Sequence, residues 1–341
     1  MTLLAIAWAC TPPDTTDHTD GLPPDGDADT DTDTDTDVDT SGTGDTAPTD
    51  TAPYVDPDCV GLPPAGPFPY VESTQIHTEE DFDFDQAGFL ITQANQDLAG
   101  VTRNGQQHIV APSIGVDAAG LRSLSTGDIM VAQPDTGSLR LVNYATGGSI
   151  VILGGLSFPN GLEATADGKV FSSEYATNGR IRLLDPYADT ADVIAQMDNP
   201  NNMALSPDGN TLYIISSQHV FYGNSKIVAL DKDSGGDWDP TPRLVHEHGS
   251  LLGGIATDKC GNVYTVEYSG GKVFRIRVDD LVVDPIADLP FGSSYSSLRF
   301  PPGIGEWNRT ELFVTNRYQM YVLDIGLEGH HVLEGMATTS R

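Results

Sequence analysis

Short apolar runs recur along this chain, and each of them directly follows a glycine. The glycines that precede these runs are Gly88, Gly127, Gly168, Gly209 and Gly261. The positions eight residues before the glycines are separated by 39, 41, 41 and 52 residues. A period near 40 residues with several short strands in each unit is typical of β-propellers.

Each repeat contains the pattern of four strands. The first strand follows the aligned position, as in Asn160–Ala164, and ends at a tight turn such as Pro207–Gly209. Glycine favours such turns because it tolerates a positive φ. The apolar run is the second strand, Lys226–Asp231 is typical of the alternating third strand, and Ser149–Leu153 is typical of the fourth. No sustained 3.6-residue periodicity appears, which predicts few helices.

A sixth unit follows the same order with less regular spacing. Its predicted strands are Ser296–Phe300, Glu311–Thr315, Met320–Asp324 and His331–Leu333. The chain is therefore predicted to be an all-β, six-bladed propeller of four-stranded antiparallel blades over residues 65–341. The predicted blades are roughly 78–115, 116–156, 157–198, 199–249, 250–293 and 294–336.

Composition separates the N-terminal region from the repeats. The 341-residue chain has a formal net charge of −32, and residues 11–58 hold fifteen Asp with no Glu, Lys or Arg. Such a segment buries too little apolar surface to offset its chain entropy, so a disordered acidic linker is predicted over residues 11–64. Because the chain is so acidic, we expect no nucleic-acid partner.

The first ten residues are apolar and end in Ala9 and Cys10. This segment resembles the end of a bacterial lipoprotein signal, in which the cysteine after the cleavage site is lipidated. The resemblance implies an extracytoplasmic protein of the bacterial cell envelope, lipid-anchored or secreted, that touches the membrane only through its anchor. We expect the protein to be a monomer. The alternative is a frayed apolar terminus. No later segment has the roughly 18 apolar residues of a membrane span.

The remaining cysteines are Cys59 and Cys260. In an exported protein they would be able to pair, which would attach the end of the linker to the fifth blade. Two unrelated free thiols are the alternative, and the sequence leaves both open.

Three motifs carry a resemblance to a known family. They are Phe158–Leu162, Pro207–Tyr213 and Gly270–Arg275. With them the chain resembles the senescence-marker, gluconolactonase and luciferin-regenerating-enzyme group of six-bladed propellers, and the resemblance covers residues 78–336. It implies a divalent metal, usually calcium, at the channel mouth, held by a Glu, two Asn and an Asp.

The aligned positions supply most of this implied ligand set. Blade one has Glu80, blade three Asn160 and blade four Asn201, but blade five has Gly253 where the family has its metal-binding, catalytic Asp. Calcium binds 6–8 oxygen ligands, so the loss of a carboxylate weakens the expected site and removes the expected base. Asn before Gly is also common in turns, which is the structural alternative for these residues.

Glu267 is a candidate replacement for the missing Asp. It lies six residues after the turn glycine of blade five, where the second strand returns toward the start of the first. The hypothesis is that its carboxylate leans toward the empty ligand position. The alternative is a polar strand end that faces solvent.

Two functions are compatible with these residues. The first is a metal-dependent hydrolase of a lactone or related ester, and the second is a non-catalytic propeller that binds a surface partner. A lyase or synthase like other members of the superfamily is a third and weaker possibility. Whether the chain is an enzyme stays open, because fold alone does not decide function.

Overall fold

The computed structural model describes residues 56–62, 66–73, 75–115, 118–188, 190–219, 222–291 and 294–334. The predicted signal segment with Cys10, and the predicted linker up to residue 55, lie outside the described residues. Among the described residues, no helix is both long enough and apolar enough to span a membrane.

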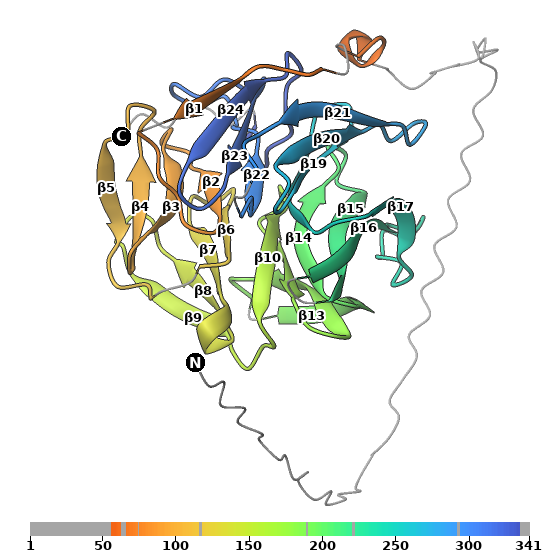
Figure 1. Ribbon diagram of the computed structural model, residues 1–341. Coiled ribbons are helices and arrows are strands. Elements are labelled where there is room, and N and C mark those ends of the chain that lie inside the picture. The colour runs from red at the N-terminus through yellow and green to blue at the C-terminus, as the bar shows by residue number, and fades with distance from the viewer. Residues whose placement is uncertain are drawn as a thin grey trace, which may run out of the picture. The chain divides into compact units, whose positions relative to one another are not determined.

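Six four-stranded antiparallel sheets are arranged in a ring, and their first strands lie nearest its centre (Figure 1). This confirms the predicted six-bladed propeller. Blade one contains β2 (Phe82–Phe84), β3 (Leu90–Ala94), β4 (Asp97–Val101) and β5 (Gln107–Ala111). Blade two contains β6 (Gly120–Ser123), β7 (Ile129–Gln133), β8 (Ser138–Val142) and β9 (Ser149–Leu153). Blade three contains β10 (Pro159–Ala164), β11 (Val170–Glu174), β12 (Gly179–Asp185) and β13 (Thr190–Met197).

The other three blades follow the same order, with one exception at the end of the ring. Blade four contains β14 (Pro200–Leu205), β15 (Thr211–His219), β16 (Tyr222–Asp231) and β17 (Arg243–His248). Blade five contains β18 (Leu252–Thr257), β19 (Val263–Glu267), β20 (Lys272–Ile276) and β21 (Val283–Asp288). Blade six contains β22 (Ser297–Arg299), β23 (Glu311–Thr315), β24 (Met320–Asp324) and β1 (Tyr70–Ser73).

The turns between first and second strands form as the sequence predicts. In blade four, Gly209 has a φ of 69°, and the Asp208 carboxylate accepts hydrogen bonds from the Ser206 hydroxyl and the Asn210 backbone N–H. An L-residue with a side chain rarely adopts this φ, so glycine is suited to the position.

Apolar side chains from neighbouring blades form the core. Phe171 of blade three packs with Met203, Leu212, Ile214 and Leu230 of blade four, and all of them are buried. Because each blade buries its faces against its neighbours, the ring is the folding unit.

The fourth strand of blade six comes from the N-terminal part of the propeller. β1 pairs antiparallel with β24, and Tyr70 lies opposite Leu323. The prediction that His331–Leu333 forms this strand is wrong. The segment forms a turn instead, in which His331 is buried and its Nε2 lies 3.0 Å from the Asp83 carboxylate of blade one. Its apolar residues are therefore buried by packing at the ring centre rather than by sheet pairing.

A disulfide joins Cys59 to Cys260, with their Cα atoms 5.5 Å apart. Cys59 ends a short 3-10 helix, η1 (Pro57–Cys59), within the segment predicted as linker. Cys260 lies in the turn between β18 and β19, on the face of the ring where the first strands end. Lys259 supports the attachment, because its ammonium group lies 2.7 Å from the Asp58 carboxylate.

Candidate functional site

The aligned positions lie at the starts of the inner strands, and in three blades they coincide with β-bulges. The pairing shifts between Pro159 and Leu162 in β10, and β14 and β18 shift at the equivalent places. A bulge re-aims side chains and is common beside functional sites. The Asn-Gly, Asn-Asn and Gly-Gly pairs of the sequence are these bulges.

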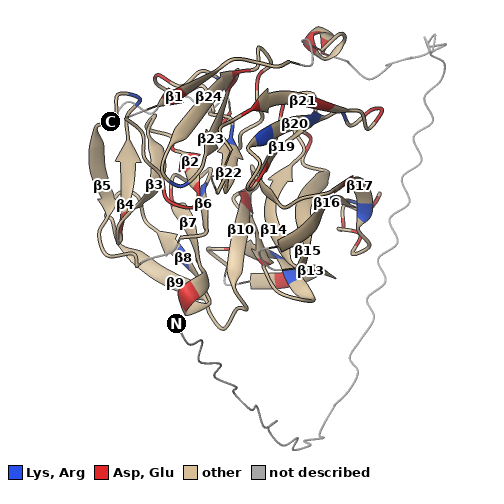
Figure 2. Ribbon diagram, viewed as in Figure 1, with Lys and Arg blue, Asp and Glu red and all other residues tan. Residues whose placement is uncertain are grey.

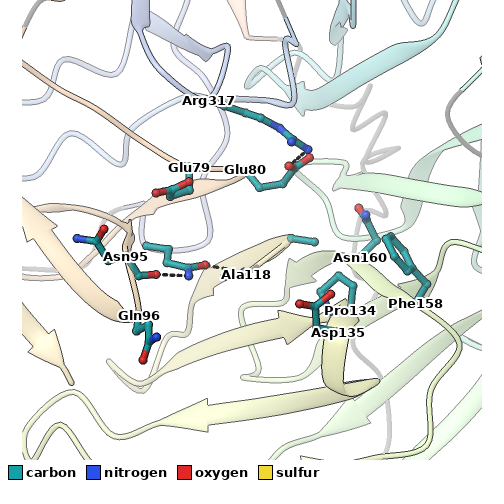
Figure 3. Close-up of a pocket in the computed structure, with 12 residues that line it drawn as sticks. Glu79, Glu80, Asn95, Gln96, Ala118, Pro134, Asp135, Phe158, Asn160 and Arg317 are labelled. Carbon is teal, nitrogen blue, oxygen red and sulfur yellow. Dashed lines mark hydrogen bonds and ion pairs between the residues drawn. The ribbon is translucent and has the colours of Figure 1, made fainter. Parts of the chain in front are cut away.

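A cavity of about 610 Å³ opens at this face, between the loops of blades one, two, three and six (Figure 3). Its lining residues are Glu79, Glu80, Gln93, Asn95, Gln96, Ala118, Ala119, Pro134, Asp135, Phe158, Asn160 and Arg317. Small-molecule sites in proteins have volumes of about 300–1,000 Å³. The structure therefore brings the predicted Glu80 and Asn160 together in a space of the right size for a small ligand.

Glu80 forms an ion pair with Arg317, which lies in the turn between β23 and β24 (Figure 3). Burial lowers the pKa of the Arg317 guanidinium, while the nearby Tyr318 and Glu79 oppose the shift. An arginine side chain is not deprotonated in proteins at neutral pH. The Arg317 guanidinium thus forms a permanent ion pair with the Glu80 carboxylate, which is the group expected to bind the metal.

Asn160 is only 9% exposed, and its side chain lies at the cavity wall. Within the described part of the chain, no side-chain hydrogen bond of this amide is seen. The amide is therefore available to a ligand that enters the cavity.

The other two predicted ligands are not at this cavity. The backbone oxygen of Asn201 accepts a 2.7 Å hydrogen bond from Ser173, and Asn201 is not among the lining residues. The Glu267 carboxylate lies 2.9 Å from the His248 ring on the neighbouring blade four, and it too is outside the lining. Its nearest polar partner is therefore a histidine rather than Glu80 or Asn160.

Gly253 has no room for a side chain. A Cβ atom built at this position would lie 1.8 Å from the backbone oxygen of Tyr295 in blade six, where real Cβ atoms stay beyond 3.0 Å. The same close approach holds at Gly161, whose Cβ would lie 2.3 Å from the Asn201 oxygen. Replacement of the family Asp by glycine is thus coupled to tight packing between the inner strands of blades five and six.

These residues do not fit the four-ligand metal site that the family resemblance implies. Glu80 is paired with Arg317, Asn201 and Glu267 are not among the residues that line the cavity, and Gly253 has no side chain to offer as a ligand. No group of three or more His, Cys, Asp or Glu suited to a metal ion is found in the described segments. Calcium needs 6–8 oxygen ligands. In this cavity the Arg317 guanidinium would compete with calcium for the Glu80 carboxylate.

Three residues of the cavity wall have a strained backbone. Asn95, Phe158 and Arg317 have φ values of 59°, 54° and 74°. Non-glycine residues at such angles cost on the order of 1 kcal/mol each and cluster at binding sites and active sites. The strain directs Phe158 and Arg317, from opposite sides of the ring, toward one cavity (Figure 3).

A buried ionic cluster lies deeper in the channel, and the sequence reasoning missed it. Arg122 donates to Asp81 at 2.9 Å and to Glu163 at 3.1 Å, and Arg299 lies 3.5 Å from Glu163. Burial raises the pKa of the Glu163 carboxyl, and Arg122 opposes that shift. Figure 2 shows acidic residues in and beside β2, at the centre of the ring.

The signal that would have revealed this cluster is a second aligned column. Each inner strand has an equivalent residue three positions after its aligned position. These residues are Asp83, Arg122, Glu163, Ala204, Ala256 and Arg299. Charged residues at one repeated offset inside buried strands require partners across the channel, because unpaired buried charges are costly.

Comparison with known proteins agrees with this architecture. The family model described as the SMP-30/gluconolactonase/LRE-like region matches residues 172–317. No curated protein sequence matches. The solved structure of a gluconolactonase from Xanthomonas campestris is similar, with a TM-score of 0.57, 16% identity, and coverage of 75% of this chain and 89% of that one.

Two further solved structures are similar to the same extent. One is described as a calcium-binding protein, regucalcin, from Agrobacterium tumefaciens, with a TM-score of 0.59, 16% identity and coverage of 77% of this chain and 95% of that one. The other is an auxiliary nutrient binding protein from Bacteroides ovatus, with a TM-score of 0.54, 13% identity and coverage of 77% and 78%. At these identities the similarity shows the fold.

Proposed function

We propose that the chain is a gluconolactonase-like propeller that binds a small molecule without the metal-dependent hydrolysis expected of the family, whose model matches residues 172–317. The observation that carries the proposal is the ion pair of Glu80 with Arg317 in the cavity. It supplies a fixed positive charge where a metal ion would need a free carboxylate.

The arrangement of the carboxylates among the described lining residues supports the same proposal. Hydrolysis of a lactone requires a group positioned to take a proton from water. The family Asp is replaced by Gly253, and Glu267 contacts His248 instead of the cavity. The remaining Glu79 and Asp135 are exposed at the rim, where water and salt screen their charges.

Calcium-dependent hydrolysis of a lactone is the competing function. It is favoured by the position of Glu80 and Asn160 at the same cavity, in the order that the family resemblance implies. The two functions differ in what calcium does to the protein, so a metal titration separates them.

The experiment uses the full chain with a small lactone panel and thermal unfolding in EDTA or calcium. We expect no calcium-dependent turnover and no calcium-dependent shift of the unfolding midpoint. Arg317→Met frees Glu80, and a calcium-dependent rise of the midpoint in this variant alone would show that the ion pair with Arg317 is what excludes the metal. A ligand at 100 times its Kd stabilises a protein by about 2.7 kcal/mol, which sets the size of a shift that can be detected.

The matched control is Arg103→Met, which breaks an ion pair with Glu311 outside the cavity and should create no calcium response. Calcium-dependent hydrolysis by the unmodified chain, lost in both Glu80→Gln and Asn160→Ala, would establish the competing function.

We also propose that the protein is exported and anchored through Cys10. The Cys59–Cys260 disulfide supports export, because disulfides persist in oxidising compartments. The disulfide lies at the turn between β18 and β19, on the face of the propeller opposite the cavity. Labelling of cells with radioactive palmitate should mark the protein, and Cys10→Ser should abolish the label; equal labelling of both would contradict lipidation at this residue.

A further inference from the structure

The charge of the cavity wall is unbalanced. Glu79, Glu80 and Asp135 face a single guanidinium, that of Arg317. Arg317 is paired with Glu80, which leaves two carboxylates at the rim. In the described structure the exposed Asp135 has no ion-pair partner.

An aromatic ring and an amide complete one wall of the cavity. Phe158 is 38% exposed and leans against Tyr175, with ring centroids 6.2 Å apart. Figure 3 shows Phe158, Asn160 and Asp135 on the same side of the cavity. Asn160 is only 9% exposed and its side chain lies at the cavity wall, so its amide offers a carbonyl oxygen to a ligand that donates a hydrogen bond.

These groups recognise a specific chemistry. An exposed aromatic face attracts a cation by its quadrupole, carboxylates attract it by charge, and an amide oxygen accepts from its N–H groups. The backbone strain at Phe158 and Arg317 holds the ring and the compensating guanidinium in place before a ligand arrives.

We propose that the cavity binds a small organic cation, an ammonium group on an apolar body. The apolar body lies on Phe158, and the ammonium lies between Asp135 and the Asn160 amide. Arg317 neutralises Glu80, so the ammonium is not drawn to that opposite wall. The inference rests on the proposed function, because it takes the cavity to be a metal-free binding site.

Other ligand classes fit the wall less well. An anion has Arg317 available only by displacing Glu80, and it meets Glu79 and Asp135 at the rim. A calcium ion needs several carboxylate or carbonyl oxygens at 2.3–2.6 Å and gains nothing from the exposed ring of Phe158.

The test compares three probes that share one ring: 2-phenylethylammonium, the neutral 2-phenylethanol and the anion phenylacetate. Binding to the full chain is measured by calorimetry in EDTA at low salt. We expect the cation to bind about tenfold more tightly than the alcohol, and phenylacetate more weakly than either. Raising the salt concentration should weaken the binding of 2-phenylethylammonium only, because salt screens the charges of the rim carboxylates.

Variants locate the binding site. Asp135→Asn and Phe158→Leu should each lower the affinity for 2-phenylethylammonium roughly two- to fivefold. Asn160→Ala should lower the affinity for 2-phenylethylammonium more than the affinity for its trimethylated analogue, because the analogue has no N–H to donate. The matched controls are Asp192→Asn on the outer strand β13 and Phe291→Leu, whose ring is 88% exposed; both lie outside the cavity and should leave the affinity unchanged.

The proposal is overturned if the cation does not bind, if the alcohol or phenylacetate binds as tightly, or if the cavity variants match their controls. None of these outcomes affects the metal-free assignment, which is tested by turnover and by calcium. Conversely, calcium-dependent hydrolysis would refute the proposed function whatever the result in EDTA.

Discussion

Restoring the family aspartate at position 253 should destabilise the protein rather than activate it. Gly253 lies in β18, and its backbone oxygen accepts a 3.1 Å hydrogen bond from the Asn202 side chain. On its other side lies Tyr295, which is fully buried and whose hydroxyl donates to the Pro290 oxygen at 2.9 Å. Both walls of the site are therefore held by their own contacts.

The structure sets the magnitude of the effect. The new Cβ would lie 1.8 Å from the Tyr295 oxygen and must reach at least 3.0 Å, so blades five and six must separate by more than 1 Å at this point. Overpacking of this kind costs about 1–3 kcal/mol. A carboxylate forced against a carbonyl oxygen without a donor adds about 2–3 kcal/mol.

Thermal unfolding of the full chain measures this cost. For Gly253→Asp we expect a loss of about 3–6 kcal/mol, which lowers the unfolding midpoint by about 6 °C or more for a domain of this size. Gly253→Ala separates the two causes, because it keeps the steric overlap without the charge. Gly249→Asp is the matched control, since no atom lies within 4 Å of its new Cβ and we expect less than about 0.5 kcal/mol of change.

The result that would refute this reasoning is a Gly253→Asp protein as stable as the unmodified chain. If such a variant also gained a calcium-dependent rise of its midpoint, the metal site would need only its fourth ligand, and the conclusion that the cavity does not fit a metal would be wrong.

Three further predictions concern the frame of the propeller. Replacing Cys59 and Cys260 by serine opens a loop of 201 residues and should lower the free energy of unfolding by up to about 5 kcal/mol; equal midpoints with and without the disulfide would contradict this. Arg122→Met leaves Asp81 and Glu163 without their buried cation and should cost about 3–5 kcal/mol in denaturant unfolding, whereas Lys226→Met, which breaks an exposed pair with Glu247, should cost about 1 kcal/mol or less. Burial raises the pKa of the Asp258 carboxyl, despite hydrogen bonds from Asn262 and Tyr264. A raised pKa means that the folded state holds this proton more tightly, so its contribution to stability is present in acid and is lost as the pH rises from about 4 through the folded pKa. Asp258→Asn has no such proton, so the free energy of unfolding of this variant, relative to that of the unmodified chain, should rise between pH 4 and pH 7. A difference between the two proteins that stays constant with pH in urea unfolding would contradict this.

Most of the fold was predictable because its determinants are close together in the chain. The Asp-Gly turns, the apolar second strands and the alternating third strands occur within about ten residues of one another, and such local patterns specify hairpins. The observed strands β16 and β24 begin within four residues of the predicted ones and end at the same residues. The fourth strand of blade six was mispredicted, because its partner β1 lies some 250 residues before β24 in the chain.

The candidate site was predictable only in part. Glu80 and Asn160 were found from their offset to a turn glycine, since equal offsets place residues at equal heights in successive blades. Arg317 follows no such offset. It lies in the β23–β24 turn, and nothing in the residues around it indicates a contact with Glu80 of blade one. Asp135 and Phe158 were likewise parts of ordinary turns until the ring placed them together.

The sequence by itself therefore determined the repeat, the six blades and the positions from which a site would be built, because these depend on local turns and strand periodicity. Only the tertiary structure decided what the site contains. Closing the ring brings blade six against blades one and five, and this contact both pairs Arg317 with Glu80 and removes the space for a side chain at Gly253. Distances between blades depend on the packing of the whole ring, which is why the chemistry of the cavity was not readable from any one repeat.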